Sequence, residues 1–302
     1  MVRRAIMGTP NIDAGQGGDA GPGARRFQSG MVGRLLDDRM TLFFCLIILL
    51  IVLSAIFAPV LAPYSPDVGS VARRLKPIGY QGHWLGTDEQ GRDMLSRLLY
   101  GGRISLLMGL VPIVFATMVG GGLGIVAGFA GGTVNTVIMR AMDVFYAFPS
   151  VLLSVAISGM LGGGLVNGLL ALTLVFIPPM CRVAETATAQ VCGLDFVDAA
   201  RASGAGVLSI IRTHIVINVA GPMLVYASSL VSISVLLAAG LSFLGFGVEP
   251  PTADWGSMLA SLRQAIYVDP ALCVLPGAAI FIASLSFNLM SDGLRQAMDA
   301  KS

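Results

Sequence analysis

Few residues in this sequence have the types and spacing that catalysis requires. The only two histidines, His83 and His214, lack the Ser/His/Asp or HExxH setting of hydrolases. The only two lysines, Lys76 and Lys301, lie outside any GxxxxGK[ST] sequence, the usual cradle for nucleotide phosphates. No cysteine spacing indicates a zinc site. We therefore expect no catalytic residue, no metal and no cofactor on this chain, so that any ATP must be used by another polypeptide.

The first polar loop with informative residues lies between Pro63 and Arg103. It contains Gly86, Thr87, Asp88, Gly91, Arg92 and Asp93. Leu95, Leu98 and Leu99 then share one face of a short helix, which we predict to lie on the outer membrane surface. The charges of Asp88, Arg92, Asp93 and Arg97 are expected to pair at the surface, where each pair stabilises little. The region is either a cap over a translocation path or a structural lid.

The second polar loop runs from Ala184 to Asn218. Asp195 is placed to cap a short helix that contains Ala199, Ala200 and Ala202, and Gly204 and Gly206 permit the turn that ends it. A second amphipathic helix follows, with apolar residues and His214 at helical spacing. On periodicity alone, a surface helix beneath the membrane explains this pattern as well.

The elements that position these loops are membrane helices. Of the 302 residues, 55% are hydrophobic and 12% are charged, which leaves too little polar surface for a soluble particle. A membrane crossing needs roughly 20 apolar residues. Six segments qualify: Thr41 to Ala62, Ile104 to Gly128, Ala141 to Leu161, Leu165 to Val183, Val219 to Leu244, and Ala271 to Met290. The sequence therefore predicts an all-α integral membrane protein with about six transmembrane helices.

Arginine and lysine positions set the predicted orientation. Residues 1–34 are expected to form a flexible tail whose arginines keep the N-terminus in the cytoplasm. Residues 35–103 contain the first membrane helix and the external loop, and residues 104–299 contain the core with the loop 184–218. Six crossings return Lys301 to the cytoplasmic side. Loop 184–218 then lies in the cytoplasm, between the fourth and fifth helices.

Within the membrane segments, glycine spacing indicates how helices pack, and the few ionisable residues indicate whether charges are buried. Gly120, Gly124 and Gly128 share one helical face and predict a close helix crossing, either mobile or static. Ionisable residues such as Asp143 and Arg182 lie near predicted helix ends, not at membrane depth. This weighs against a proton-coupled carrier, which usually needs buried charges.

The second loop resembles a known family. The order Asp198-Ala199-Ala200, Gly204-Ala205 and His214-Ile215 is similar to the EAA loop of ABC importer permeases, approximately EAAxxxGA followed by HILPN. Asp198 replaces the usual Glu, and Ile217 stands where Pro is common. In that family the loop forms a coupling helix docked on an ATPase subunit. The resemblance implies this role for Asp198, Ala199, Ala200, Gly204, Ala205 and His214.

Two other stretches resemble one subfamily. His83 to Asp88, Gly91 to Asp93 and Ser96 to Leu98 are similar to the HPLGTDxxGRDxLSRLIYGARISL signature of the C-type subunit of dipeptide, oligopeptide and nickel permeases. Leu241 to Gly247, with Pro250-Pro251 and Asp254-Trp255-Gly256, matches the second external signature of that subfamily. The resemblance extends from about Leu35 to Asp299.

The resemblance implies half of the translocation pathway of an ATP-driven importer for short peptides in the bacterial inner membrane. Its expected partners are a homologous B-type permease, two ATPase subunits that bind ATP and Mg, an external solute-binding protein and membrane lipid, with no nucleic acid. The chain itself is not expected to be an enzyme. The alternative is a self-contained secondary carrier or channel, which would transport without ATP.

Overall fold

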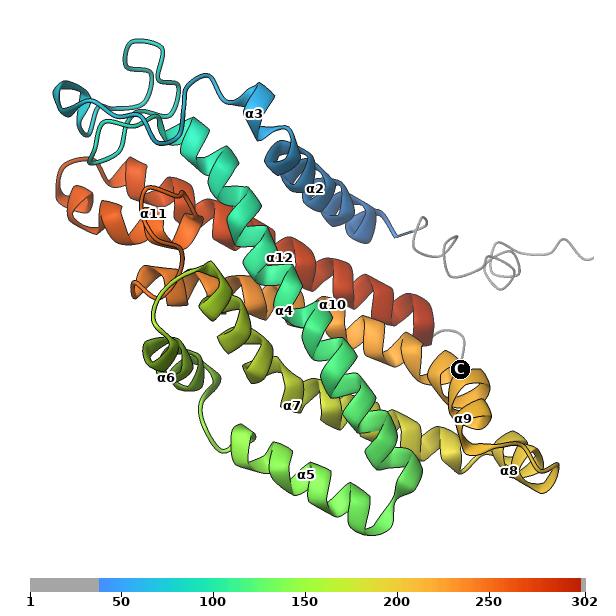
Figure 1. Cartoon of the computed structure of the whole chain (residues 1–302). Coiled ribbons are helices and arrows are strands. Elements are labelled where there is room, and N and C mark those ends of the chain that lie inside the picture. The colour runs from blue at the N-terminus through green and yellow to red at the C-terminus, as the bar shows by residue number, and fades with distance from the viewer. Residues whose placement is uncertain (1–37, 300–302) are drawn as a thin grey trace, which may run out of the picture.

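The computed structural model describes residues 38–299, which form helices joined by loops (Figure 1). The predicted flexible tail (1–34) and Lys301 lie outside the described residues. In chain order the elements are α2 (Arg39–Ile56), α3 (Ala58–Leu61), η2 (Val71–Arg73), α4 (Met94–Ala130), α5 (Gly132–Tyr146), α6 (Ser150–Leu161), α7 (Leu165–Cys192), α8 (Asp195–Ala202), α9 (Val207–Ile210), η3 (Ile211–Ile215), α10 (Val216–Phe243), α11 (Trp255–Ser261), η4 (Leu262–Tyr267) and α12 (Pro270–Asp299).

The number of membrane helices agrees with the sequence. Within residues 38–299, five helical stretches are long and apolar enough to cross a membrane: α2, α4, α7, the run Val207–Phe243 and α12. The pair α5 and α6 is the sixth if the two are counted as one bent span. The prediction of an all-α membrane protein with about six transmembrane helices is confirmed.

The third predicted segment, Ala141 to Leu161, is not one continuous helix. α5 ends at Tyr146, α6 begins at Ser150, and the two axes meet at 86°. Pro149 gives the physical reason, because a proline disfavours the helical conformation of the residue before it, here Phe148. The expectation that this segment forms one membrane helix is therefore wrong in detail, and Figure 1 shows α6 turned away from α5.

The prediction of a separate external amphipathic helix is also wrong. Asp93 caps α4 by accepting a hydrogen bond from the backbone N–H of Ser96 at 2.8 Å, and the helix then continues through Pro112 to Ala130. Its 37 residues span about 55 Å, so it extends well beyond a hydrocarbon core of roughly 30 Å. Leu95, Leu98 and Leu99 belong to the first turns of this long helix.

The predicted glycine face makes the crossing of α4 with α7. A Cβ atom added at Gly124 would overlap the carbonyl oxygen of Cys181, and one added at Gly128 would lie 2.7 Å from the carbonyl oxygen of Glu185. Gly120 approaches the backbone of Ile177 in the same way. Small residues allow such backbone contact between membrane helices. The close crossing is confirmed, and its movement stays a prediction.

Serine side chains join α10 to α12 inside the bundle. Ser228 and Ser291 form a hydrogen bond between their hydroxyl oxygens at 3.0 Å, and the Ser284 hydroxyl donates to the carbonyl oxygen of Ser232 at 3.2 Å. Hydroxyl groups that bond across helices hold membrane bundles together where apolar surfaces alone give little preference.

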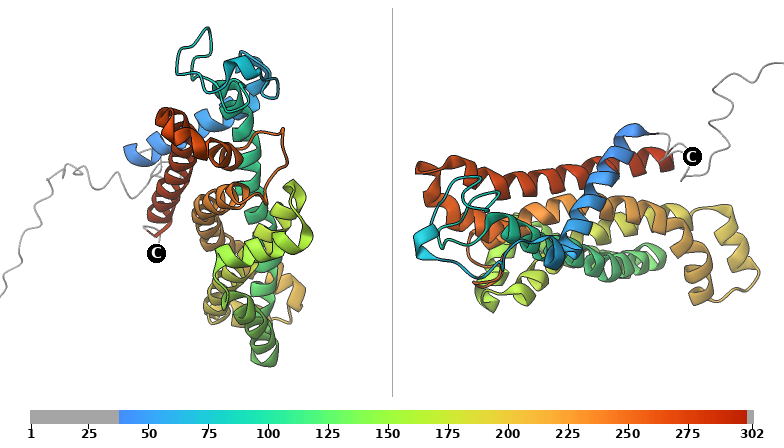
Figure 2. Two further views of the ribbon diagram at one scale, coloured as in Figure 1. Left: turned by 90° about the vertical axis from the view of Figure 1, so that its left-hand side faces the viewer. Right: turned by 90° about the horizontal axis from the view of Figure 1, so that it is seen from above.

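The two ends of the bundle are different. Thr41 of α2 packs against Gly293 of α12, and Met298 of α12 lies against Gly221 of α10, so the start of α2 and the end of α12 share one end. α8 lies at this same end, which we call the α8 end (Figures 1 and 2). The opposite end, which we call the long-loop end, holds residues 63–93 together with α11 and η4.

Candidate functional site

The long loop, residues 63–93, folds over charged side chains that are withdrawn from solvent. His83, Asp88, Arg92, Asp93 and Arg97 are all buried, and we call this set the long-loop network. The sequence predicted that four of these residues pair at the surface. Asp88 does pair with Arg92 and Arg97, but the predicted surface location is wrong. A buried charge is costly unless it is paired and hydrogen-bonded, so the partners of each group show what it does.

Asp88 is the centre of the long-loop network. Its Oδ1 accepts hydrogen bonds from the backbone N–H groups of Gln90 at 2.8 Å and Arg92 at 2.9 Å. Its Oδ2 accepts a hydrogen bond from Arg92 Nε at 2.7 Å and lies 3.3 Å from Arg97 Nε. Two cations and two backbone donors thus compensate one buried carboxylate. The lone pairs of Asp88 are committed to holding the loop.

Asp93 connects the loop to the start of α4. Its Oδ2 accepts from the Ser96 hydroxyl at 2.7 Å as well as from the Ser96 N–H, and its Oδ1 lies 2.8 Å from His83 Nδ1. Arg73 Nη1 lies 3.2 Å from His83 Nε2. Arginine can only donate, so Nε2 accepts and the imidazole proton is on Nδ1, from which it is donated to Asp93.

The two glycines of the first signature lie where the neighbouring backbone leaves no room for a side chain. Gly86 and Gly91 have φ of +77° and +72°, a region that favours glycine. A Cβ atom would overlap the carbonyl oxygen of Lys76 at Gly86 and that of Ser70 at Gly91. Thr87 lies between them, fully buried, and its hydroxyl accepts a hydrogen bond from the Lys76 N–H at 2.9 Å.

Arg97 joins the first signature to the second. Its Nη1 donates to the carbonyl oxygens of Pro66 at 3.1 Å and Pro251 at 3.3 Å. Beside it, the N–H of Trp255 donates to the Ser105 hydroxyl at 3.0 Å, and the indole N–H donates to the Leu98 carbonyl oxygen at 2.9 Å. The two stretches that the sequence singled out separately therefore form one folded unit at the long-loop end.

At the α8 end, Gly204 terminates α8 in the way that the sequence predicted. It has φ of +77°, and its N–H donates to the Arg201 carbonyl oxygen at 3.0 Å. The N–H of Ala205 donates to the Ala200 carbonyl oxygen at 3.1 Å, which completes a Schellman motif. Gly206 has φ of −65° and needs no special freedom. Asp195 is the first residue of α8, not its cap, since Leu194 occupies the cap position without a side-chain bond.

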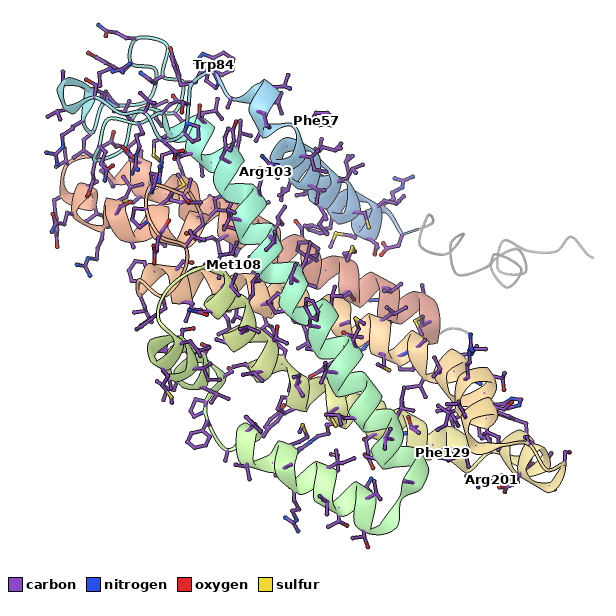
Figure 3. All side chains as sticks on the ribbon, in the orientation of Figure 1. Phe57, Trp84, Arg103, Met108, Phe129 and Arg201 are labelled. Atoms are coloured by element: carbon purple, nitrogen blue, oxygen red, sulfur yellow. The ribbon has the colours of Figure 1, made fainter. Side chains whose placement is uncertain are left out.

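α8 is held to the bundle by a few side chains and exposes the rest. Val197 is fully buried, the ring of Phe196 lies 5.9 Å from that of His214 in η3, and the Arg201 guanidinium lies 5.5 Å from the ring of Phe129 in α4. Figure 3 shows Arg201 and Phe129 together at this end and Trp84 at the other. The signature residues Asp198 and Ala199 remain exposed.

The predicted second amphipathic helix is the beginning of the next membrane helix. α9, the π-helical turn η3 and α10 follow one another without a break from Val207 to Phe243. His214 lies in the π-helical turn, where its ring is half-buried against α8. A helical face with moderate polarity cannot be distinguished from the first turns of a membrane helix by periodicity alone.

Comparisons with known proteins identify the family. Residues 120–302 match the family described as binding-protein-dependent transport system inner membrane component, and residues 29–77 match the N-terminal transmembrane domain of oligopeptide transport permease C. The chain belongs to this permease family. It is 44% identical over 263 residues to the di/tripeptide transport system permease protein DppC of Pseudomonas aeruginosa, covering 85% of this chain and 86% of that relative.

Further relatives differ in the cargo that their names state. The permease is 38% identical over 271 residues to the probable D,D-dipeptide transport system permease protein DdpC of Escherichia coli, which covers 90% of this chain and 91% of that protein. It is 36% identical over 268 residues to the glutathione transport system permease protein GsiD of Pectobacterium atrosepticum, which covers 89% of each chain.

The permease also brings together two charges that sequence analysis had assigned separately to helix ends. Arg182 Nη2 of α7 lies 2.6 Å from Asp143 Oδ1 of α5, and both side chains remain about half exposed. Asn135 of α5 donates to Glu185 Oε1 of α7 at 2.6 Å. The sequence contained the signal, namely four polar residues in apolar surroundings, but it could not pair them because the approach of α5 to α7 depends on the fold.

Proposed function

We propose that this chain is one permease subunit of an ATP-driven importer, and that it forms half of the translocation pathway for short peptides across the bacterial inner membrane. Membership of the permease family carries the proposal, and the names of its relatives support a peptide cargo. The finer choice among dipeptides, longer peptides and glutathione depends on a solute-binding partner that captures the cargo.

The partners follow from what the chain lacks and from what it exposes. A homologous B-type permease would supply the other half of the pathway, and two ATPase subunits would bind ATP and Mg, since this chain has no phosphate-binding lysine motif. An external solute-binding protein would deliver the peptide at the long-loop end. There the indole of Trp84 is 70% exposed and available to a partner, while the buried long-loop network holds the surrounding loop in shape.

α8 is the proposed coupling helix, with the α8 end in the cytoplasm. It exposes Asp198 and Ala199 to a docking partner, and it contacts α4 through Phe129 and η3 through His214. A force applied to α8 by closing ATPase subunits would therefore reach two membrane helices directly. Asp198, Ala199, Ala200, Gly204, Ala205 and His214 would act together as this coupling unit.

Cysteine labelling tests the orientation. In a variant without Cys45, Cys181, Cys192 and Cys273, a Ser203→Cys residue should react with an impermeant reagent only from the cytoplasmic side, and a Trp84→Cys residue only from outside. Reaction of Ser203→Cys from outside would reverse the orientation and remove the proposed coupling.

Reconstitution tests the energy source. The complete importer in liposomes should take up a labelled dipeptide only with ATP and its solute-binding protein, and this chain alone should neither hydrolyse ATP nor transport. Uptake by the isolated chain without ATP would contradict the proposal and favour a secondary carrier or channel.

A further inference from the structure

A cavity of about 490 Å³ lies where α5 bends into α6. Its walls are residues 145–150 of the bend, the part of α7 around Pro178 and Pro179, and the part of α10 around Tyr226. Pockets for small ligands usually have volumes of roughly 300 to 1,000 Å³ and mostly apolar walls. Five aromatic side chains line this one: Phe145, Tyr146, Phe148, Phe176 and Tyr226.

Charged side chains border the cavity on one side. Asp143 precedes the lining residue Tyr146 by one helical turn, and Arg182 follows Pro178 by one turn. The Arg182 guanidinium lies 4.8 Å from the centre of the Tyr146 ring, which places it next to a lining side chain of the cavity. Arg140 Nη1 lies 3.8 Å from Asp143 Oδ2. With Glu185, which follows Arg182 by one turn of α7, the two arginines face two carboxylates.

The Arg182 guanidinium has hydrogen-bond donors left for a ligand. A guanidinium has five N–H donors, and the contacts of Arg182 within residues 38–299 are the Asp143 carboxylate and the Tyr146 ring. Its side chain is 48% exposed and that of Asp143 is 43% exposed. An arginine with unused donors suits a carboxylate, which it can bind through two parallel hydrogen bonds.

The charged side chains beside the cavity are unsuited to lipid. Ionised side chains within membrane helices face a protein interior or a water-filled path, because exposure to hydrocarbon is costly. α2, which is largely apolar after Arg39 and buries only Thr41 and Ala55, lies on the other side of α4 from α5 and α6 (Figures 1 and 2). α2 thus marks a lipid-facing side, and the charges of Asp143 and Arg182 require protein or water beside them on the side of α5.

We propose that this cavity is a transient cargo site, in which Arg182 binds the terminal carboxylate of a passing peptide and the aromatic lining receives an apolar side chain next to it. The inference rests on the proposed peptide cargo. Asp143 holds the guanidinium beside the Tyr146 ring, and the partial exposure of both charges favours release over tight binding.

Photolabelling of the complete importer in nanodiscs tests the site. The probe is a dipeptide with a photoreactive aromatic side chain at its C-terminal residue, and its ATP-driven uptake is measured first in liposomes with the solute-binding protein. Irradiation without that protein should then label this chain at the cavity wall, and Phe148→Ala should lower the yield by about twofold to tenfold. Leu236→Ala, on an exposed part of α10 outside the cavity, is the matched control.

The carboxylate contact is tested with the C-terminal amide of the same probe. The free acid should label the wild type about tenfold better than the amide, and Arg182→Gln should remove that preference. A purely structural ion pair would be restored by exchanging the two charges, so a wild-type preference in the double variant Arg182→Asp/Asp143→Arg would overturn the inference.

The two proposals fail in different ways. Uptake of the probe without labelling of this chain would overturn the cargo site alone. Absence of ATP-driven uptake for the probe and for unmodified dipeptides would contradict the proposed peptide import, and the cargo site with it.

Discussion

Gly91 in the long loop and Gly204 after α8 have almost the same backbone dihedral φ, +72° and +77°, in opposite surroundings. A Cβ atom at Gly91 would overlap the Ser70 carbonyl oxygen, whereas no neighbouring atom of residues 38–299 lies within 4 Å of a Cβ atom at Gly204. Both glycines allow a turn that other residues adopt with strain. Only Gly91 is also part of a packed structure.

The aspartates of the two regions differ in the same way. The side chain of Asp88 is 3% exposed and contacts two arginines, whereas that of Asp198 is 69% exposed and lies 3.2 Å from one exposed arginine, Arg201. Signature residues of one chemical type therefore serve different purposes. Those of the long loop stabilise this chain, and those of α8 remain exposed, as the proposed docking of a partner requires.

The largest expected effect comes from Asp88→Ala. It would leave two buried guanidiniums without their carboxylate, which costs about 3 to 5 kcal/mol. We expect a large loss of thermal stability in detergent and little protein in the membrane. Glu89→Gln, next to it in the same loop, is the control and should keep wild-type stability. A normal melting temperature for Asp88→Ala would contradict the contrast with Asp198, since Asp88 would then behave like a surface residue.

Gly91→Ala should have the next largest effect. Strain at positive φ and overlap with Ser70 together should cost about 2 to 4 kcal/mol. Gly79→Ala separates these causes, because Gly79 lies in the same loop at φ of +84° with open space around it. Thermal unfolding of both variants is the measurement. Equal losses would show that backbone strain, not packing, explains the role of Gly91.

Gly204→Ala should cost less, about 1 kcal/mol, because only the backbone dihedral is unfavourable. Gly206→Ala is the matched control, since its φ of −65° suits any residue and it has open space. We expect Gly204→Ala, and more strongly Gly204→Val, to reduce the amount of ATPase subunit that co-purifies with the chain. Full recovery of the ATPase with Gly204→Val would mean that the geometry of α8 does not determine docking.

Asp198→Ala should have the smallest effect on stability, below about 0.5 kcal/mol, because an exposed ion pair contributes little. Its effect on transport should nevertheless be about tenfold, as for a residue central to an interface. The measurement is ATP-driven uptake of a labelled dipeptide at equal expression. Loss of thermal stability as large as that of Asp88→Ala, or normal uptake, would each contradict the contrast between the two regions.

The sequence predicted the membrane class, most of the spans, the glycine crossing and the turn at Gly204, because each depends on residues close together in the chain. It did not predict the bend at Pro149 within the third segment. A single proline is tolerated in many membrane helices, as Pro112 is within α4, so its presence alone did not distinguish a break from a continuous helix.

Only the tertiary structure decided which charges are buried. Asp88, Arg92 and Arg97 look in the sequence like any polar loop, and their burial depends on contacts such as that between Arg97 and the Pro251 carbonyl oxygen, 154 positions away. Apolar runs report local transfer from water to lipid and can be recognised along the chain. The environment of a charge is set by whatever distant segments fold over it, and that information appears only when the helices are packed.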